Sequence, residues 1–176
     1  MKKPGILLVL ALVLAGCIAE DAPTSSSVDK IAAGDRGKPM PAFEVPLLAG
    51  GTLKSDDLKG KVLIVDFWAT WCKPCIEEIP KYNELSAKYD GKAVAFIGMT
   101  VQSGSLDDIK PKAAELKIRY PVVLGNDDIE DGFGGIIGWP TTFLISKEGM
   151  IVKKYMGSPP GKLEQMAKDI ETLLAR

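Results

Sequence analysis

Histidine is absent from this chain of 176 residues, and cysteine occurs only three times. The missing imidazole excludes histidine metal ligands, histidine general bases and histidine haem ligation. The apolar run at residues 5–15 is too short to span a bilayer comfortably, since a spanning helix needs about 20 residues. Positive and negative charges nearly balance, with 22 basic and 23 acidic residues, so the composition gives no reason to expect nucleic-acid binding.

The N-terminal segment predicts a leader rather than part of the fold. Two lysines precede the apolar residues 5–15, and the segment ends in Leu-Ala-Gly-Cys at Cys17. It resembles a bacterial lipoprotein signal, whose cysteine is acylated and becomes the first mature residue. We expect residues 1–16 to be the signal peptide and residues 17–38 to be the lipidated cysteine with a flexible tether. An ordinary secretory signal, or an uncleaved anchor with an incidental cysteine, is the alternative.

The two remaining cysteines, Cys72 and Cys75, form a lone Cys-x-x-Cys pair that the leader would place outside the cytosol. The chain is long enough to fold on its own core, so the pair is not needed as a structural staple. A zinc site needs two more ligands, and no spare cysteine or histidine exists. Haem attachment through this motif requires histidine next, and Ile76 stands there instead. We therefore expect a pair that cycles between dithiol and disulfide, and no metal.

The segment Trp-Cys-Lys-Pro-Cys directly follows the apolar run at residues 62–68. The run predicts a strand buried on both faces, and Pro74 suits the first turn of a following helix. Unpaired N–H groups at a helix N-terminus stabilise a thiolate, the nucleophile of disulfide exchange. We expect Cys72 to be the attacking thiol and the more exposed of the two, with Lys73 lowering its pKa further. Cys75 would resolve the mixed disulfide.

The rest of the chain alternates strands with helices, and an α/β fold follows from that pattern. A closing hairpin and helix complete a mixed central sheet with helices on both faces, and the βαβ part is expected to be parallel and right-handed. The expected strands are 43–48, 52–53, 62–67, 93–100, 120–124, 141–146 and 150–156, and the expected helices are 74–89, 105–117 and 162–174, with room for a short helix in 126–138.

Two distant segments resemble the thioredoxin superfamily. Residues 65–75, Val-Asp-Phe-Trp-Ala-Thr-Trp-Cys-Lys-Pro-Cys, are similar to its active-site strand and turn, and residues 138–143, Gly-Trp-Pro-Thr-Thr-Phe, are similar to its cis-proline loop. The N-terminal hairpin, the Leu-Lys-Gly-Lys lead-in and the Ala-Thr-Trp-Cys sequence point to the TlpA/ResA-like branch. For residues 39–176 the resemblance implies a thioredoxin-like three-layer sandwich, acting as a membrane-tethered thiol–disulfide oxidoreductase outside the cytoplasm.

The resemblance also implies roles for two acids. Asp66 interrupts an apolar strand, so its pKa should be raised, and it matches the acid that helps to deprotonate the resolving cysteine. Many TlpA-like proteins carry asparagine at this position. Glu78 follows Cys75 by one helical turn and matches the glutamate of a ResA-like Cys-x-x-Cys-x-x-Glu-x-Pro pattern, which tunes the thiols and helps to recognise substrate. A solvent-facing strand residue and a solvated helix glutamate are the alternatives.

Pro140 would be the cis-proline that faces the disulfide and frees a backbone edge for a substrate segment, unless it is a trans-proline in a loop. All three tryptophans lie in the two active-site segments. Trp68 is expected in the core, whereas Trp139 could shield the disulfide or narrow the choice of substrate. The expected substrate-binding residues are Trp71, Lys73, Pro74, Trp139 and Thr141.

The first functional hypothesis is a lipid-anchored reductase of protein disulfides, with no cofactor beyond its own redox-active disulfide. The resemblance implies apocytochrome c, or a carrier that handles it, as substrate, and re-reduction by a membrane thiol transporter of the CcdA or DsbD type. We expect a monomer in the periplasm or on the outer face of the cytoplasmic membrane. A dithiol oxidase or isomerase is the alternative; Lys73 is compatible with it, whereas Asp66 and Glu78 oppose it.

Two more distant hypotheses remain, a thiol peroxidase and a metallochaperone. Peroxidases of this kind place Pro-x-x-x-Thr-x-x before their cysteine, and Ala69 stands at the threonine position before Cys72. The lack of histidine, and of a methionine cluster near the thiols, opposes a metallochaperone. The sequence leaves open the direction of electron flow, the specific substrate, the electron donor and the membrane that holds the lipid.

Overall fold

The computed structural model describes residue 1 and residues 36–176. The predicted signal peptide, the lipidation site Cys17 and nearly all of the predicted tether lie outside the described residues. Within the described part of the chain, no helix combines the length and the apolar character that crossing a membrane requires.

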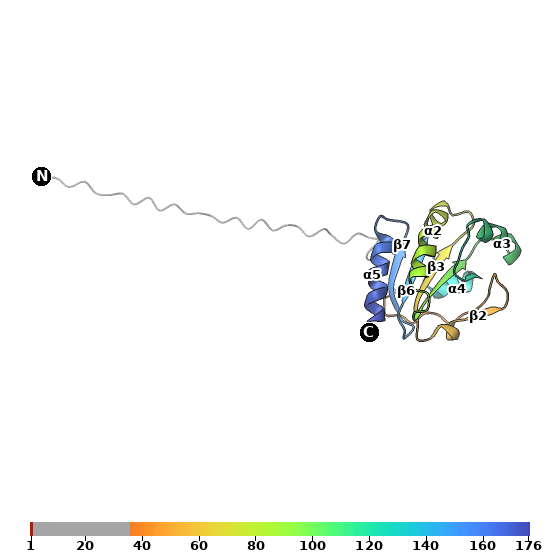
Figure 1. The fold of residues 1–176 in the computed structure, drawn as a ribbon, viewed down its shortest axis with the longest axis horizontal. Helices are drawn as coiled ribbons and strands as arrows, with labels where there is room; N and C mark the ends of the chain where they lie inside the picture. Colours follow the sequence, from red (N-terminus) through yellow and green to blue (C-terminus); the bar gives the residue numbers. More distant parts are fainter. Residues whose placement is uncertain (2–35) are drawn as a thin grey trace.

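A five-stranded mixed sheet forms the middle layer, in the order β5-β4-β3-β6-β7 (Figure 1). The central strand β3 (Val62–Trp68) runs parallel to β4 (Val94–Thr100) and antiparallel to β6 (Thr141–Ile145). On the outside, β5 (Val122–Leu124) pairs in parallel with β4, and β7 (Ile151–Met156) pairs antiparallel with β6. Every residue of β3 is buried, as expected for a strand that is covered on both faces.

Three helices cover one face of this sheet. α2 (Lys73–Lys88) and α5 (Lys162–Leu174) lie side by side, and α3 (Leu106–Glu115) lies on the β5 side (Figure 1). Val62 and Ile64 of β3 pack into the apolar cluster that α2 and α5 form with the sheet. These even-numbered residues of β3 point to the same face because side chains alternate along a strand.

The opposite face is covered by an N-terminal hairpin and two short helices. The hairpin pairs β1 (Glu44–Pro46) with β2 (Thr52–Lys54). The short helices are η1 (Ser55–Leu58) and α4 (Asp127–Gly132), and their apolar side chains join those of the hairpin in one buried cluster. The centre of that cluster is a group of aromatic rings with centroids 4.8–5.7 Å apart, formed by Phe67, Phe133 and Phe143.

The predicted α/β architecture is confirmed, with its mixed sheet, its N-terminal hairpin and helices on both faces. The predicted strands and helices are all present, with ends that differ by a few residues, and the short helix allowed for in residues 126–138 is α4. Ser105 precedes α3 as expected for an N-cap, and its backbone N–H donates to Asp108 Oδ2 at 2.8 Å.

Candidate active site

Cys72 and Cys75 form a disulfide where β3 gives way to α2. Cys72 is the N-cap of α2, and its Sγ accepts a hydrogen bond from the backbone N–H of Cys75 at 3.3 Å. Pro74 lies in the first turn of the helix, where its missing N–H leaves no hydrogen bond unmade. When the disulfide is reduced, a sulfur in this place is stabilised as a thiolate by the helix N-terminus.

Both cysteines are almost completely buried in the disulfide form, and the expected greater exposure of Cys72 amounts to one per cent. Only 3% of Cys72 and 2% of Cys75 is exposed in the disulfide form. Trp139 packs against the apolar cluster that contains both cysteines, and its ring meets that of Trp71 edge-on, with centroids 5.6 Å apart. Trp139 thus helps to cover the disulfide, which is one of the two roles considered for it.

The loop before β6 carries the cis-proline. The Trp139–Pro140 peptide bond is cis, and Pro140 is buried. Thr141 is buried too, its Oγ1 donates to the carbonyl of Gly138 at 2.6 Å, and its backbone lies between β3 and β7. Thr141 therefore supports the loop from within, and the substrate contact predicted for it stays a prediction.

Exposed apolar side chains stand at this end of the molecule. Trp71 is 57% exposed, and Ile137, on the loop that carries Trp139, is exposed as well. The indole N–H of Trp71 donates to the carbonyl of Gln102 at 2.9 Å, so the loop after β4 holds the ring in place. Large exposed apolar side chains mark surfaces that bind other molecules. Sequence reasoning missed Ile137, because an isoleucine in a glycine-rich loop gives no signal of exposure.

Lys73 points away from the protein surface at the start of α2. Its side chain is highly exposed, and its Nζ lies 3.9 Å from Glu77 Oε1, in an (i, i+4) pair along the helix. Glu77 is exposed. The predicted effect of Lys73 on the pKa of the Cys72 thiol stays a prediction.

Asp66 is buried in β3 beneath α2. Its Oδ1 accepts a hydrogen bond from Thr142 Oγ1 at 2.7 Å, and Thr142 is its direct neighbour across the β3–β6 pair. The hydroxyls of Thr142 and Tyr82 also share a hydrogen bond of 2.7 Å. Burial raises the pKa of Asp66 to about 6, against the opposing effects of the Lys162 charge and the Thr142 hydrogen bond. The burial and the raised pKa predicted for this residue are confirmed.

Glu78 is buried against α5, unlike its neighbour in sequence. Its Oε2 accepts from Lys162 Nζ at 2.8 Å, and the lysine side chain is only 1% exposed. The same Nζ donates to the carbonyl of Gly157 at 3.0 Å. Cys75, Glu78 and Tyr82 are spaced three and four residues apart, so they share the buried face of α2. The network of Asp66, Thr142, Tyr82, Glu78 and Lys162 is called the polar network below.

Sequence reasoning missed three members of the polar network. Lys162 lies four residues before Met166, so the buried stripe of the last helix extends to a lysine, and a lysine there requires an acid partner. The spacing of Tyr82 in its helix gives no partner for its hydroxyl, which the structure places on Thr142. Thr142 could not be paired with Asp66 because the sequence does not give the register of two distant strands.

The site offers two cysteine sulfurs, a buried carboxyl group of raised pKa and an apolar surface beside them. Within the described residues, no group of three or more His, Cys, Asp or Glu side chains is arranged to hold a metal ion. Two sulfurs at a helix N-terminus, with a buried carboxyl group in the strand beneath that helix, are groups that thiol–disulfide exchange can use.

Comparison with known proteins supports this chemistry. The model of the AhpC/TSA family matches residues 36–154. Thiol-disulfide oxidoreductase ResA of Bacillus thuringiensis is 32% identical over 178 residues, which cover 100% of this chain and 98% of the relative. Thiol:disulfide interchange protein DsbE of Pseudomonas fluorescens is 37% identical over 123 residues, covering 69% of this chain and 66% of the relative.

A solved structure agrees with the sequence relatives. The crystal structure of a thiol:disulfide interchange protein of the thioredoxin family from Chlorobium tepidum matches with a TM-score of 0.70 at 30% identity, covering 79% of this chain and 97% of that one. The fold, the disulfide and the relatives lead to one assignment. The chain belongs to the AhpC/TSA family and is a thiol–disulfide oxidoreductase of its ResA-like, thioredoxin-fold branch.

Proposed function

We propose that this oxidoreductase reduces protein disulfides outside the cytoplasm while anchored to a membrane by lipid. One observation carries the direction: two acids are buried at this site, Asp66 in the strand beneath α2 and Glu78 on the same face of α2 as Cys75. Strong oxidants stabilise their reduced form through a very acidic attacking thiol. Nearby negative charge opposes thiolate formation. Lys162 balances Glu78, and Asp66 adds a second negative charge whenever it ionises, so the site favours a reductant.

The reaction proceeds through a mixed disulfide. The Cys72 thiolate attacks one sulfur of a substrate disulfide, and the other substrate sulfur leaves as a thiolate and takes a proton. Cys75 then gives its proton to the Asp66 carboxylate and attacks Cys72 Sγ. The Cys72–Cys75 bond forms, the bond between Cys72 and the substrate breaks, and the second substrate thiolate takes up a proton. Two electrons and two protons pass to the substrate.

The substrate that fits this site is an extended protein segment containing cysteine. Trp71 and Ile137 present apolar surface beside the disulfide, and Trp139 meets Trp71 edge-on. Such a surface suits an unfolded chain better than a small hydrophilic disulfide. Within the TlpA/ResA-like branch, apocytochrome c or its carrier is the implied substrate, and a CcdA- or DsbD-type transporter is the implied electron donor.

The lipid anchor rests on the sequence at Cys17. The apolar residues 5–15 lead directly into Gly16 and Cys17, and they are too short for a comfortable membrane span. A lipidated cysteine anchors a protein without a spanning helix. Replacement of Cys17 by alanine in the full chain should abolish labelling by radioactive fatty acid, and labelling that persists would contradict the anchor.

The redox state of the pair in the cell tests the direction. Cells that express the full chain are quenched with acid, and free thiols are alkylated with a reagent large enough to shift the protein on a gel. A reductase whose cysteine pair is kept reduced by an electron donor is expected to run mainly as the dithiol form. A protein found mainly as the disulfide would support the oxidase alternative instead. The double variant Cys72→Ser/Cys75→Ser marks the position of the unalkylated protein.

A further inference from the structure

Lys162 is the buried cation of the polar network, with only 1% of its side chain exposed. It begins α5, and the preceding Gly161 is in the left-handed region at φ 79°, which brings the chain sharply onto the sheet. The Nζ of Lys162 contacts Glu78 Oε2 and the Gly157 carbonyl, and it lies 5.7 Å from the centroid of the Tyr82 ring. A buried ammonium is strongly destabilising unless it is paired, so these contacts are needed to keep Lys162 buried.

The groups that face Asp66 come from four elements. α2 supplies Glu78 and Tyr82, α5 supplies Lys162, the segment before β5 supplies Tyr120, and β6 supplies the neutral Thr142. Burial raises the pKa of both tyrosines well above the usual value, so both stay neutral at ordinary pH. The two charged groups among them are therefore Glu78 and Lys162, and these act on Asp66 in opposite directions.

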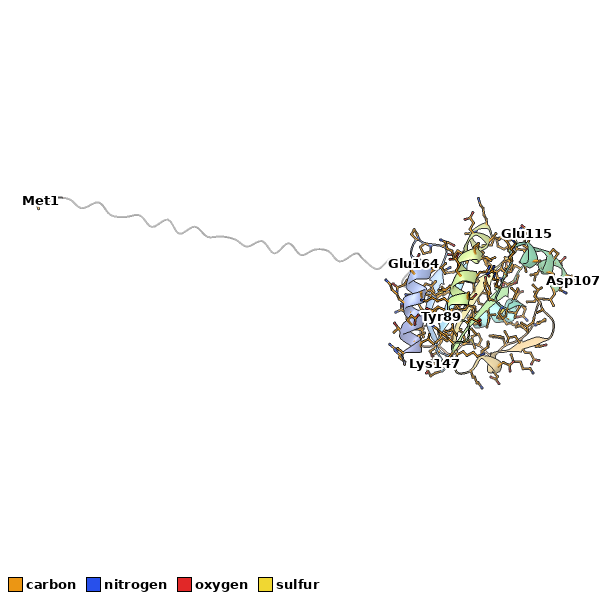
Figure 2. All side chains as sticks on the ribbon, in the orientation of Figure 1. Met1, Tyr89, Asp107, Glu115, Lys147 and Glu164 are labelled. Atoms are coloured by element: carbon orange, nitrogen blue, oxygen red, sulfur yellow. A yellow bond between two sulfur atoms is a disulfide. The ribbon has the colours of Figure 1, made fainter. Side chains whose placement is uncertain are left out.

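The ion pair also borders solvent. A pocket of about 390 Å³ opens between the first turns of α2 and α5, and Glu78 and Lys162 line it together with Pro74, Pro159 and Glu164. Figure 2 labels Glu164 at this end of α5, with Lys147 at the other end. Glu78 and Lys162 thus lie between this pocket and the interior where Asp66 is buried.

We propose that Lys162 is a positioning residue for the resolving step. Its ammonium holds Glu78 in place on the helix face of Cys75 and keeps Asp66 able to ionise, so Lys162 sets the pH range in which Cys75 resolves the mixed disulfide. The proposal rests on the proton-accepting role proposed above for Asp66. In that step the Cys75 proton moves to Asp66, the Cys72–Cys75 bond forms, and the substrate thiolate leaves with a proton from solvent.

The resolving step can be followed separately with 5,5′-dithiobis(2-nitrobenzoate). Attack by Cys72 releases one nitrothiobenzoate at a rate that depends on reagent concentration. Resolution by Cys75 releases a second one at a rate that does not depend on it. Stopped-flow absorbance of the second release, recorded from pH 5 to 9, gives a midpoint for each folded variant. Circular dichroism checks that each variant is folded.

Substitutions of the two partners of the ion pair should shift the pH midpoint of the second release in opposite directions. Lys162→Met removes the cation beside Asp66, so the midpoint should rise by about one pH unit or more, slowing the second release about tenfold below the wild-type midpoint. Glu78→Gln removes the like charge, so the midpoint should fall. Lys162→Arg keeps the charge and should stay near wild type. Lys153→Met, which removes another lysine bound to an acid of α5, is the matched control and should change nothing.

Opposite shifts are a signature that damage to the fold would not produce. If Lys162→Met does not fold, the fall expected for Glu78→Gln still tests the proposal. Equal midpoints in the folded variants, or a rise in Glu78→Gln, would overturn it. Asp66→Asn separates the two proposals. If this variant loses the pH dependence while the Lys162 variants keep the wild-type midpoint, Asp66 acts as proposed and Lys162 does not. If Asp66→Asn keeps the wild-type profile, both roles fail.

Discussion

β3 sends alternate side chains to the two faces of the central sheet, and the two faces differ in chemistry. Phe67 and its odd-numbered neighbours enter an apolar cluster centred on Phe133 and Phe143. Asp66, one residue away, enters a layer that also contains a buried ion pair. The first face has apolar contacts that stabilise the fold. The second face also holds buried charged groups that can move protons, and their burial lowers the stability of the fold.

The comparison shows why the polar network can stay buried. An isolated ionised carboxylate inside a protein is strongly destabilising. Here Thr142 donates to Asp66, and Lys162 pairs with Glu78. The aromatic cluster on the far side of the same strand is where the fold gains the stability that such a site requires. The following predictions separate the two faces, beginning with the largest effect.

Removing the chemistry while keeping the fold gives the largest effect. Cys72→Ser should lower the rate of insulin reduction by about a thousandfold or more, because it removes the attacking sulfur. The thermal midpoint should match that of the reduced wild-type protein. Cys75→Ser should stop at the mixed disulfide and accumulate it on Cys72. Multiple turnovers by Cys72→Ser would contradict the assignment of the attacking thiol.

A substitution in the apolar face should lower the stability of the fold and leave the thiol chemistry intact. Phe143→Ala leaves a cavity between Phe67 and Phe133, so the free energy of unfolding should fall by about 3–5 kcal/mol, measured by denaturant titration. The rate of thiol exchange per folded molecule should stay near that of wild type. Phe143→Leu is the milder control. A loss below about 1 kcal/mol for alanine would show that this cluster does not stabilise the fold.

Neutralising Asp66 should stabilise the protein at neutral pH. Burial raises the pKa of Asp66 from 3.8 to about 6, so the folded state holds this proton at pH values where the unfolded state has released it. Stability from this group is therefore greatest below pH 3.8 and declines up to about pH 6. Over roughly two pKa units the loss is about 3 kcal/mol. Asp66→Asn should gain about that amount at pH 7 relative to wild type and little at pH 3.

The control for that prediction is an acid on the surface. Asp56→Asn, in an exposed pair with Lys59, should change the free energy of unfolding by well under 1 kcal/mol at either pH. If wild type and Asp66→Asn differ by the same amount at pH 3 and pH 7, the raised pKa of Asp66 is wrong.

The smallest expected effect concerns the substrate surface. Trp71→Ala should weaken binding of a protein substrate by about 5- to 30-fold in KM, since an exposed tryptophan at an interface contributes about 1–2 kcal/mol. The rate with a small disulfide should hardly change, because that reagent does not use the surface. An equal loss with both substrates would place the role of Trp71 in the chemistry instead.

Local patterns in the sequence predicted the strands and the two acids, but not the contacts between distant segments. Alternation and apolar runs predicted the strands, and Asp66 was identified because a carboxylate stands out in an apolar run. Glu78 followed from its helical spacing to Cys75 and from its match to a ResA-like motif. The partners of both acids come from α5 and β6, and only the tertiary fold brings those segments together. The depth at which both cysteines are buried could not be predicted for the same reason, since it depends on packing with the distant loop at Trp139.

The reduction potential of the Cys72–Cys75 pair is the most direct test of the central claim, that the buried acids Asp66 and Glu78 make this protein a reductant. Equilibration of the purified domain with dithiothreitol or glutathione buffers at pH 7 gives the value. The account predicts a potential near or below about −230 mV, toward the thioredoxin end of the scale. A value above about −160 mV, toward that of DsbA, would contradict it and identify a disulfide donor.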